Sequence, residues 1–205
     1  MNILKPIDRV SEAVEKLKSK YSSIIKKTTS RRKEISGIIT HSLKIKTTNT
    51  GSMVEIKPEQ RKCFACWHSH PPLSVLTVPE EDVLFTPPSH TDLYYALIGK
   101  SLSKYNHSFV ISFEGIYRIT PTDKAVEFCV SELAELLSSD DPWRLPAEPV
   151  DRSTYDFHGM ESSYPYMVKL LNMKIDWDKS NLDSAVRHYI DEAGKLDITV
   201  EFYKM

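Results

Sequence analysis

Two histidines stand two positions apart in the run CFACWHSHPP, which covers residues 63–72. On a β-strand the side chains of His68 and His70 would project from one face, so both imidazoles could bind the same metal ion. Imidazole nitrogen is a good ligand for Zn²⁺. A carboxylate in the first turn of a helix could add a third ligand, and Asp92 in the run PSHTD fits that description. Three protein ligands leave a fourth tetrahedral position for water, as in catalytic zinc sites.

Three motifs, EISG, HSHP and PSHTD, follow one another in the order found in the JAMM metallopeptidases, also called MPN+ or JAB-domain proteins. The chain resembles this family over residues 6–137. The resemblance implies that Glu34 is the general base that takes a proton from the attacking water. It also implies that Ser89 helps to stabilise the oxyanion of the tetrahedral intermediate. It assigns one zinc ion per chain to His68, His70 and Asp92.

Members of this family mostly cleave isopeptide bonds between ubiquitin, or a ubiquitin-like protein, and a lysine. The resemblance therefore implies a zinc-dependent isopeptidase, a deubiquitinase-like hydrolase whose partners are ubiquitin or ubiquitin-like conjugates. Two other functions stay open, namely a non-catalytic scaffold subunit of the same fold and a JAB-type peptidase that acts on another peptide or small-protein conjugate. The sequence also leaves open whether a partner subunit activates the chain.

The spacing between the second histidine and the third ligand is longer than the family usually has. Ser89 stands 19 residues after His70, so the chain carries an insertion of about ten residues, which is tolerable because loop-closure entropy grows slowly with length. Asp82 lies nearer to the family spacing, but Pro79 occupies the place of its serine. We therefore prefer Asp92 as the ligand and keep Asp82 as the alternative.

The inserted loop, PLSVLTVPEEDVLFTPP, combines apolar residues with an acidic cluster. Ubiquitin-type proteins present an apolar patch with basic surroundings, so the resemblance suggests that this loop helps to bind the substrate. The residues expected to contact the substrate are Val75, Leu76, Val83, Leu84 and Phe85. An inert surface insertion is the alternative interpretation.

A CxxC pair, Cys63 and Cys66, precedes the histidines. A structural zinc site of two cysteines and two histidines is disfavoured because Cys63 would point to the opposite face of the strand and the usual long segment between the pairs is missing. We expect both cysteines to be small buried hydrophobes of a core strand. Ser69 and His90 adjoin the expected ligands, but no pattern marks them as more than neighbours.

The elements that must position these residues follow from the periodicity of the apolar side chains. The pattern predicts helices over residues 6–27, from Ser89 as N-cap to about residue 105, over 125–139, and from Asn181 as N-cap to Gly194. It predicts strands over 34–40, 43–48, 52–58 and 63–71, on both sides of Glu114 and Gly115, and over 196–205. A turn at residues 49–51 would join the second and third of these strands in a hairpin.

The predicted fold class is α/β, more narrowly α+β, with a mostly antiparallel β-sheet flanked by helices. The family resemblance adds a JAB/MPN-like core, related to the cytidine-deaminase fold, with the metal at one sheet edge between the HSHP strand and the helix that starts at Ser89. We expect a catalytic domain over residues 1–140, a linker or arm over 141–160 and a C-terminal extension over 161–205, a helix plus a strand packed on the core.

The bulk composition limits the partners of the chain. Its 205 residues carry a formal net charge of −1, which offers no global attraction for nucleic acid or an anionic membrane. The local run of basic residues over 16–33 is expected to be a solvated helix face. The absence of a long apolar stretch or a signal-like N-terminus, together with three cysteines, favours an intracellular protein, cytoplasmic or nuclear.

Overall fold

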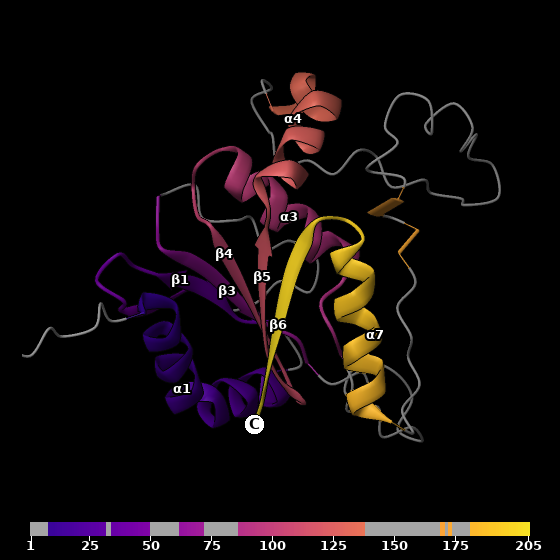
Figure 1. Cartoon of the computed structure of the whole chain (residues 1–205). Helices are drawn as coiled ribbons and strands as arrows, with labels where there is room; N and C mark the ends of the chain where they lie inside the picture. Colours follow the sequence, from indigo (N-terminus) through magenta and orange to yellow (C-terminus); the bar gives the residue numbers. More distant parts are fainter. Residues whose placement is uncertain are drawn as a thin grey trace, which may run out of the picture.

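The computed structural model describes residues 8–31, 34–49, 62–71, 86–137, 169–170, 172–173 and 181–205. Its elements follow the chain in a mixed order of helices and strands (Figure 1). They are α1 (Arg9–Arg31), β1 (Ser36–Ile39), β2 (Ile45–Asn49), β3 (Ala65–Ser69), α3 (His90–Ser101), β4 (His107–Ser112), β5 (Gly115–Pro121), α4 (Asp123–Leu137), α7 (Leu182–Gly194) and β6 (Ile198–Lys204).

The six strands form one sheet in the order β2-β1-β3-β4-β5-β6. Every neighbouring pair is antiparallel except β3 and β4, which run parallel. The predicted α+β class, with a mostly antiparallel sheet and flanking helices, is therefore confirmed. The HSHP strand, β3, is an inner strand of this sheet, between β1 and β4.

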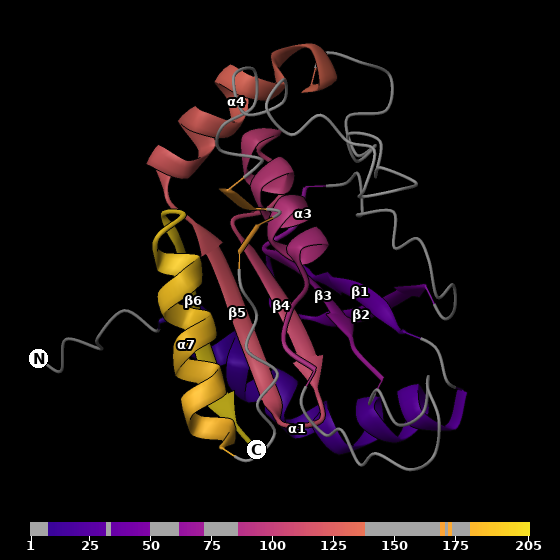
Figure 2. The same ribbon diagram turned by 90° about the vertical axis from the view of Figure 1, so that its right-hand side faces the viewer.

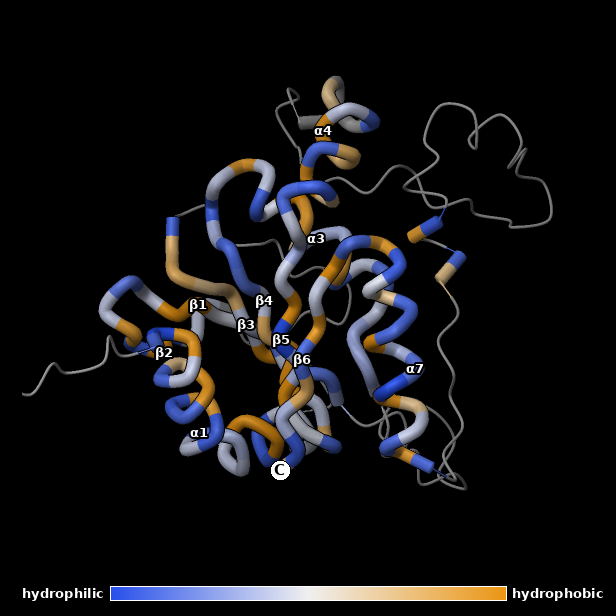
Figure 3. The backbone as a smooth tube through the Cα atoms, in the orientation of Figure 1, coloured by the Kyte–Doolittle hydropathy of each residue, from blue (hydrophilic) through white to orange (hydrophobic). Residues whose placement is uncertain are grey.

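Helices cover both faces of the sheet (Figures 1 and 2). On one face α1 packs its apolar side against Trp67, Phe109 and Ile111, and on the other face α3 and α7 pack around Val110 and Tyr117. Residues of β4 alternate between the two cores, as the pleat of a strand requires. Figure 3 shows the matching alternation of hydrophobic and hydrophilic positions along α1 and α7, which is typical of helices packed on one face.

The parallel pairing of β3 with β4 requires a crossover connection, and α3 lies within it. The carboxyl ends of both strands therefore lie side by side, β3 ending at Ser69 and β4 at Ser112. These strand ends lie at the end of the sheet opposite to α4, near the C-terminus of the chain (Figure 1). It is the place where the chemistry-bearing residues gather.

Most predicted elements are present, with shifted bounds. The first helix extends to Arg31, four residues beyond its predicted end. The second strand, β2, pairs with β1 through the turn at residues 40–44. The predicted hairpin at 49–51 falls mostly, and its partner strand over 52–58 entirely, outside the described residues.

The C-terminal helix and strand form where the sequence predicts them. The side chain of Asn181 accepts a hydrogen bond from Ser184 N as the N-cap of α7, and the helix ends at Gly194. Strand β6 pairs with β5 along its whole length, and Tyr189 of α7 is buried against the sheet. The expected linker over 141–160 lies outside the described residues. In the described part of the chain, no helix has the length and apolarity needed to cross a membrane.

We predict that Gly99→Ala destabilises the protein, because an added Cβ would lie only 2.1 Å from the ring of Tyr105. Overpacking of this kind costs about 1–3 kcal/mol of unfolding free energy, and at about 2–4 °C per kcal/mol the melting temperature should fall by several degrees. Gly194→Ala in α7 is the matched control, since an added Cβ there meets nothing within 4 Å. Equal melting temperatures for the two variants would contradict the packing of α3 on Tyr105.

Candidate metal centre

Three side chains converge at the carboxyl end of β3. His68 belongs to β3 and, since Trp67 faces α1, projects toward the α3 side of the sheet. His70 follows the strand, and its backbone N–H still donates to the carbonyl of Ile111 at 2.9 Å. Asp92 is the third residue of α3 and is buried. The strand and the first turn of the crossover helix thus bring two imidazoles and one carboxylate together.

The distances between these side chains suit one metal ion. Nε2 of His68 lies 3.1 Å from Nε2 of His70 and 2.9 Å from Oδ1 of Asp92. Nε2 of His70 lies 3.3 Å from Oδ2 of Asp92. Two ligand atoms of a tetrahedral site with bonds of 2.0–2.1 Å are about 3.3 Å apart. The group can therefore hold a metal ion, and its ligand atoms all lie within 4.8 Å of one another.

The capping box of α3 orients the carboxylate ligand. Oδ2 of Asp92 accepts hydrogen bonds from the backbone N–H of Ser89 at 2.6 Å and from its hydroxyl at 2.7 Å. Oδ1 is left facing His68. The predicted N-cap role of Ser89 is confirmed. Because its hydroxyl proton points at Asp92, Ser89 acts in this structure as the residue that orients a ligand, and its oxyanion role stays a prediction.

A backbone carbonyl orients His70 from its other ring nitrogen. Nδ1 of His70 lies 3.3 Å from the carbonyl oxygen of Thr86. An imidazole that donates from Nδ1 presents an unprotonated Nε2, which is the form that binds a metal. The carboxylate of Glu114 in turn accepts hydrogen bonds from the backbone N–H of Thr86.

Glu34 lies beside the three ligands, just before β1. Its Oε1 is 3.9 Å from Nε2 of His70, and its side chain is 28% exposed. Burial raises the pKa of Glu34, although the neighbouring imidazoles of His68 and His70 oppose this shift. A carboxyl group with a raised pKa beside a group that can hold a metal ion could accept and return a proton near neutral pH.

The ligands strongly affect one another's ionisation in the metal-free protein. Burial opposes the charged form of His70, but the carboxylate of Asp92 outweighs this and raises the pKa of His70 to about 9. Burial also disfavours the carboxylate of Asp92, yet the charges of His68 and His70 hold the pKa of Asp92 well below its usual range. The opposite charges of His70 and Asp92 thus stabilise each other in the buried cluster.

Ser69, which the sequence presented only as a neighbour of the ligands, ties three segments together. Its Oγ accepts a hydrogen bond from the backbone N–H of Ile35 at 3.1 Å and lies 2.6 Å from the hydroxyl of Thr28 in α1. Both hydroxyl-bearing side chains are fully buried. Since Ile35 follows Glu34, Ser69 fixes the backbone beside Glu34 relative to β3. No local sequence pattern points to this contact, because its partners are 34 and 41 residues away.

The other residues singled out from the sequence have different outcomes. Cys63 is buried in the core, and Cys66 is half-buried with its thiol donating to Ser108. Neither belongs to the group that can hold a metal. Nε2 of His90 lies 2.8 Å from the carbonyl of Met173 and so contacts the C-terminal part of the chain. The alternative ligand Asp82 lies outside the described residues, as do the expected substrate-binding residues Val75, Leu76, Val83, Leu84 and Phe85.

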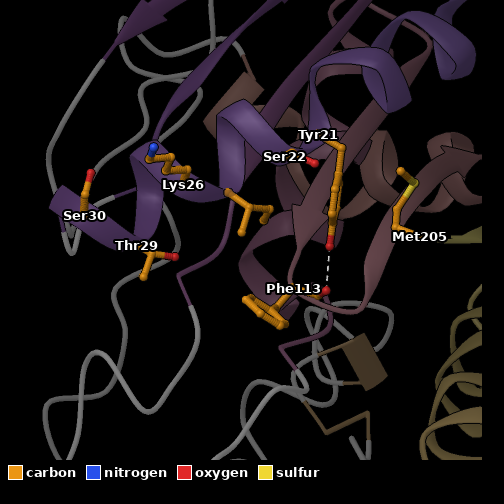
Figure 4. A pocket seen from close by; sticks show the side chains of 8 residues that line it. Tyr21, Ser22, Lys26, Thr29, Ser30, Phe113 and Met205 are labelled. Carbon is orange, nitrogen blue, oxygen red and sulfur yellow. Dashed lines mark hydrogen bonds between the residues drawn. The ribbon is translucent and has the colours of Figure 1, made fainter.

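An apolar hollow of about 570 Å³ lies at the same end of the sheet, between α1 and the turn that follows β4 (Figure 4). Phe113 and Met205, which line it, are 41% and 49% exposed. The hydroxyl of Tyr21 donates to the carbonyls of Ser112 and Phe113 and holds the turn in place. Phe113 thus borders the hollow, whereas its neighbour Glu114 contacts the segment beside the metal centre.

Comparison of this chain with protein-family models, with curated proteins and with solved structures found no match.

We predict that Ser69→Ala lowers the melting temperature, because the buried N–H of Ile35 would lose its side-chain acceptor. Leaving a buried donor unsatisfied costs about 1–3 kcal/mol. Ser131→Ala on α4 is a matched control, since Ser131 is exposed and its hydroxyl donates to the carbonyl of Phe128 within its own helix. Calorimetry on the two variants checks the prediction, and equal melting temperatures would contradict the bridging role of Ser69.

We also predict that metal binding releases a proton. In the metal-free protein His70 is protonated below about pH 9, and the metal must displace that proton to reach Nε2. Affinity should therefore rise with pH, by about tenfold per unit for one displaced proton, and level off above about pH 9. Titrations with Co²⁺ at pH 7.5 and 8.5 measure the slope. An affinity that does not change across this interval would show that His70 carries no displaceable proton.

Proposed function

We propose that this chain is a zinc-dependent isopeptidase of the JAMM type, which hydrolyses the amide bond between ubiquitin, or a ubiquitin-like protein, and a lysine. The observation that carries the proposal is the carboxylate of Glu34 placed 3.9 Å from a ligand nitrogen of the group formed by His68, His70 and Asp92. The order of the three motifs in the sequence supports the family, and the choice of ubiquitin as substrate follows from the family alone.

The donor set favours zinc among the metals that such a group could hold. Two imidazole nitrogens and one carboxylate oxygen form a three-ligand set of the kind found in catalytic zinc sites. Calcium and magnesium prefer all-oxygen sites with more ligands, which this cluster does not offer. A zinc ion held there supplies Lewis acidity toward the scissile carbonyl and lowers the pKa of water to about 7.

The chain's own residues can carry the proton transfers. Glu34 accepts a proton from the attacking water on its carboxylate and returns it to the nitrogen of the departing lysine, since a carboxyl group with a raised pKa can do both near neutral pH. The carboxylate is 28% exposed, so solvent can reach it from one side. Asp92 is held by Ser89, and His70 is held by the carbonyl of Thr86, so both side chains need little reorganisation during the reaction.

The experiment that tests the proposal is incubation of the purified protein with a panel of ubiquitin dimers of different linkage. We expect cleavage of at least one dimer, loss of cleavage with a zinc chelator, and its return when zinc is added back. Cleavage that survives the chelator would contradict the metal mechanism. If the zinc-loaded protein cleaves no dimer but hydrolyses another peptide or conjugate, the result would favour the JAB-type peptidase. If it cleaves no substrate at all, the result would favour the non-catalytic scaffold.

We predict that Glu34→Gln lowers the turnover number by about 10²- to 10⁴-fold, because it removes the proton acceptor while keeping the shape of the side chain. Zinc content should stay at one ion per chain, since Glu34 is not among the proposed ligands. Glu127→Gln, an exposed position on α4, is the matched control and should retain wild-type turnover. Full activity of Glu34→Gln would exclude Glu34 as the general base.

A further inference from the structure

Glu114 is a buried carboxyl group that the proposed hydrolysis does not use. It lies in the turn between β4 and β5 and is only 7% exposed. Its carboxylate accepts hydrogen bonds from the backbone N–H of Thr86, at 3.2 Å to Oε1 and 3.3 Å to Oε2, and from the hydroxyl of Tyr117 at 2.9 Å. Burying a carboxyl group is costly unless hydrogen bonds compensate. These hydrogen bonds compensate for the burial of Glu114 and tie its carboxylate to the backbone of Thr86.

Thr86 connects Glu114 to the metal centre. The carbonyl of Thr86 lies 3.3 Å from Nδ1 of His70. Thr86 belongs to no helix or strand, so no regular ladder of backbone hydrogen bonds sets the direction of this carbonyl. The carboxylate of Glu114 holds the N–H of the same residue instead. The direction of the carbonyl thus depends on a side chain 28 residues further along the chain.

We propose that Glu114 is a positioning residue for metal binding. By holding the backbone of Thr86, it aims the Thr86 carbonyl at Nδ1 of His70 and so turns Nε2 toward the metal. The inference rests on the metal centre of the proposed function. Groups that orient a metal-binding histidine in this indirect way change metal affinity by about 10- to 100-fold when they are removed. Tyr117 supports the same carboxylate from β5.

The test compares the metal affinity of variants, with Co²⁺ as the probe because its visible absorption reports both binding and coordination geometry. Glu114→Leu, which keeps the bulk but removes the acceptor, should weaken Co²⁺ binding by about 10- to 100-fold. Glu114→Gln should restore affinity close to wild type, since its amide oxygen can accept from Thr86 N–H while its NH₂ group donates to the oxygen of Tyr117. Two-bond ¹H–¹⁵N spectra of the zinc-loaded protein should show His70 protonated on Nδ1 in the wild type and perturbed in Glu114→Leu.

The matched control is Tyr21→Phe. It removes a hydroxyl that contacts the same turn from the α1 side, at the carbonyls of Ser112 and Phe113. Its Co²⁺ affinity should equal that of the wild type. If Glu114→Leu does not fold, Tyr117→Phe provides a milder change, which should also weaken Co²⁺ binding, though by less.

The possible results distinguish a failure of this inference from a failure of the proposed function. Wild-type affinity and unchanged His70 signals in Glu114→Leu, or in Tyr117→Phe where it replaces that variant, would overturn the inference and leave the metal centre intact. Equal losses in Tyr21→Phe would overturn it as well, by showing a general effect of the turn. If the wild-type protein binds no Co²⁺, both the metal centre and the inference would be wrong. If Co²⁺ affinity depends on Glu114 but the protein cleaves no conjugate, only the isopeptidase proposal would be wrong.

Discussion

Strands β3 and β4 run parallel, and α3 lies in the connection between them. This pairing places the end of β3 next to the start of α3, which is why two histidines and an aspartate far apart in the sequence meet. An antiparallel neighbour could have been reached through a short hairpin, without a helix in the connection. The hydrogen bond from His70 N–H to Ile111 extends the pairing past the last residue of β3 and keeps the second histidine in register.

Hydrogen bonds around the candidate centre divide into those that hold His70 and Asp92 and those that hold the backbone beside Glu34. Ser89 fixes Asp92, and the carbonyl of Thr86 fixes His70. Ser69 fixes the backbone beside Glu34 through Ile35. All these contacts lie at the end of the sheet where β3 and β4 finish. The site is consequently supported by both helical layers, so a packing change in either layer can move it.

The charges within this cluster, which could hold a metal ion, stabilise one another. Asp92 raises the pKa of His70, and the two histidines lower that of Asp92, so the cluster favours a buried ion pair. Breaking up a buried charge pair without replacing it is costly. A metal ion held by these residues would replace the proton of His70 and would balance the negative charge of Asp92 in its place.

The sequence by itself determined the helices, most of the strands, the capping box at Ser89 and which three residues could hold a metal ion, because periodicity and capping are local and the motifs lie within a few residues. It did not determine that β3 is an inner strand, nor that Ser69 would hold Ile35 and Glu114 would hold Thr86. Those contacts join residues 34 and 28 positions apart. They depend on which strands pair and how the helices pack, and a buried serine or glutamate looks the same in the sequence as an exposed one.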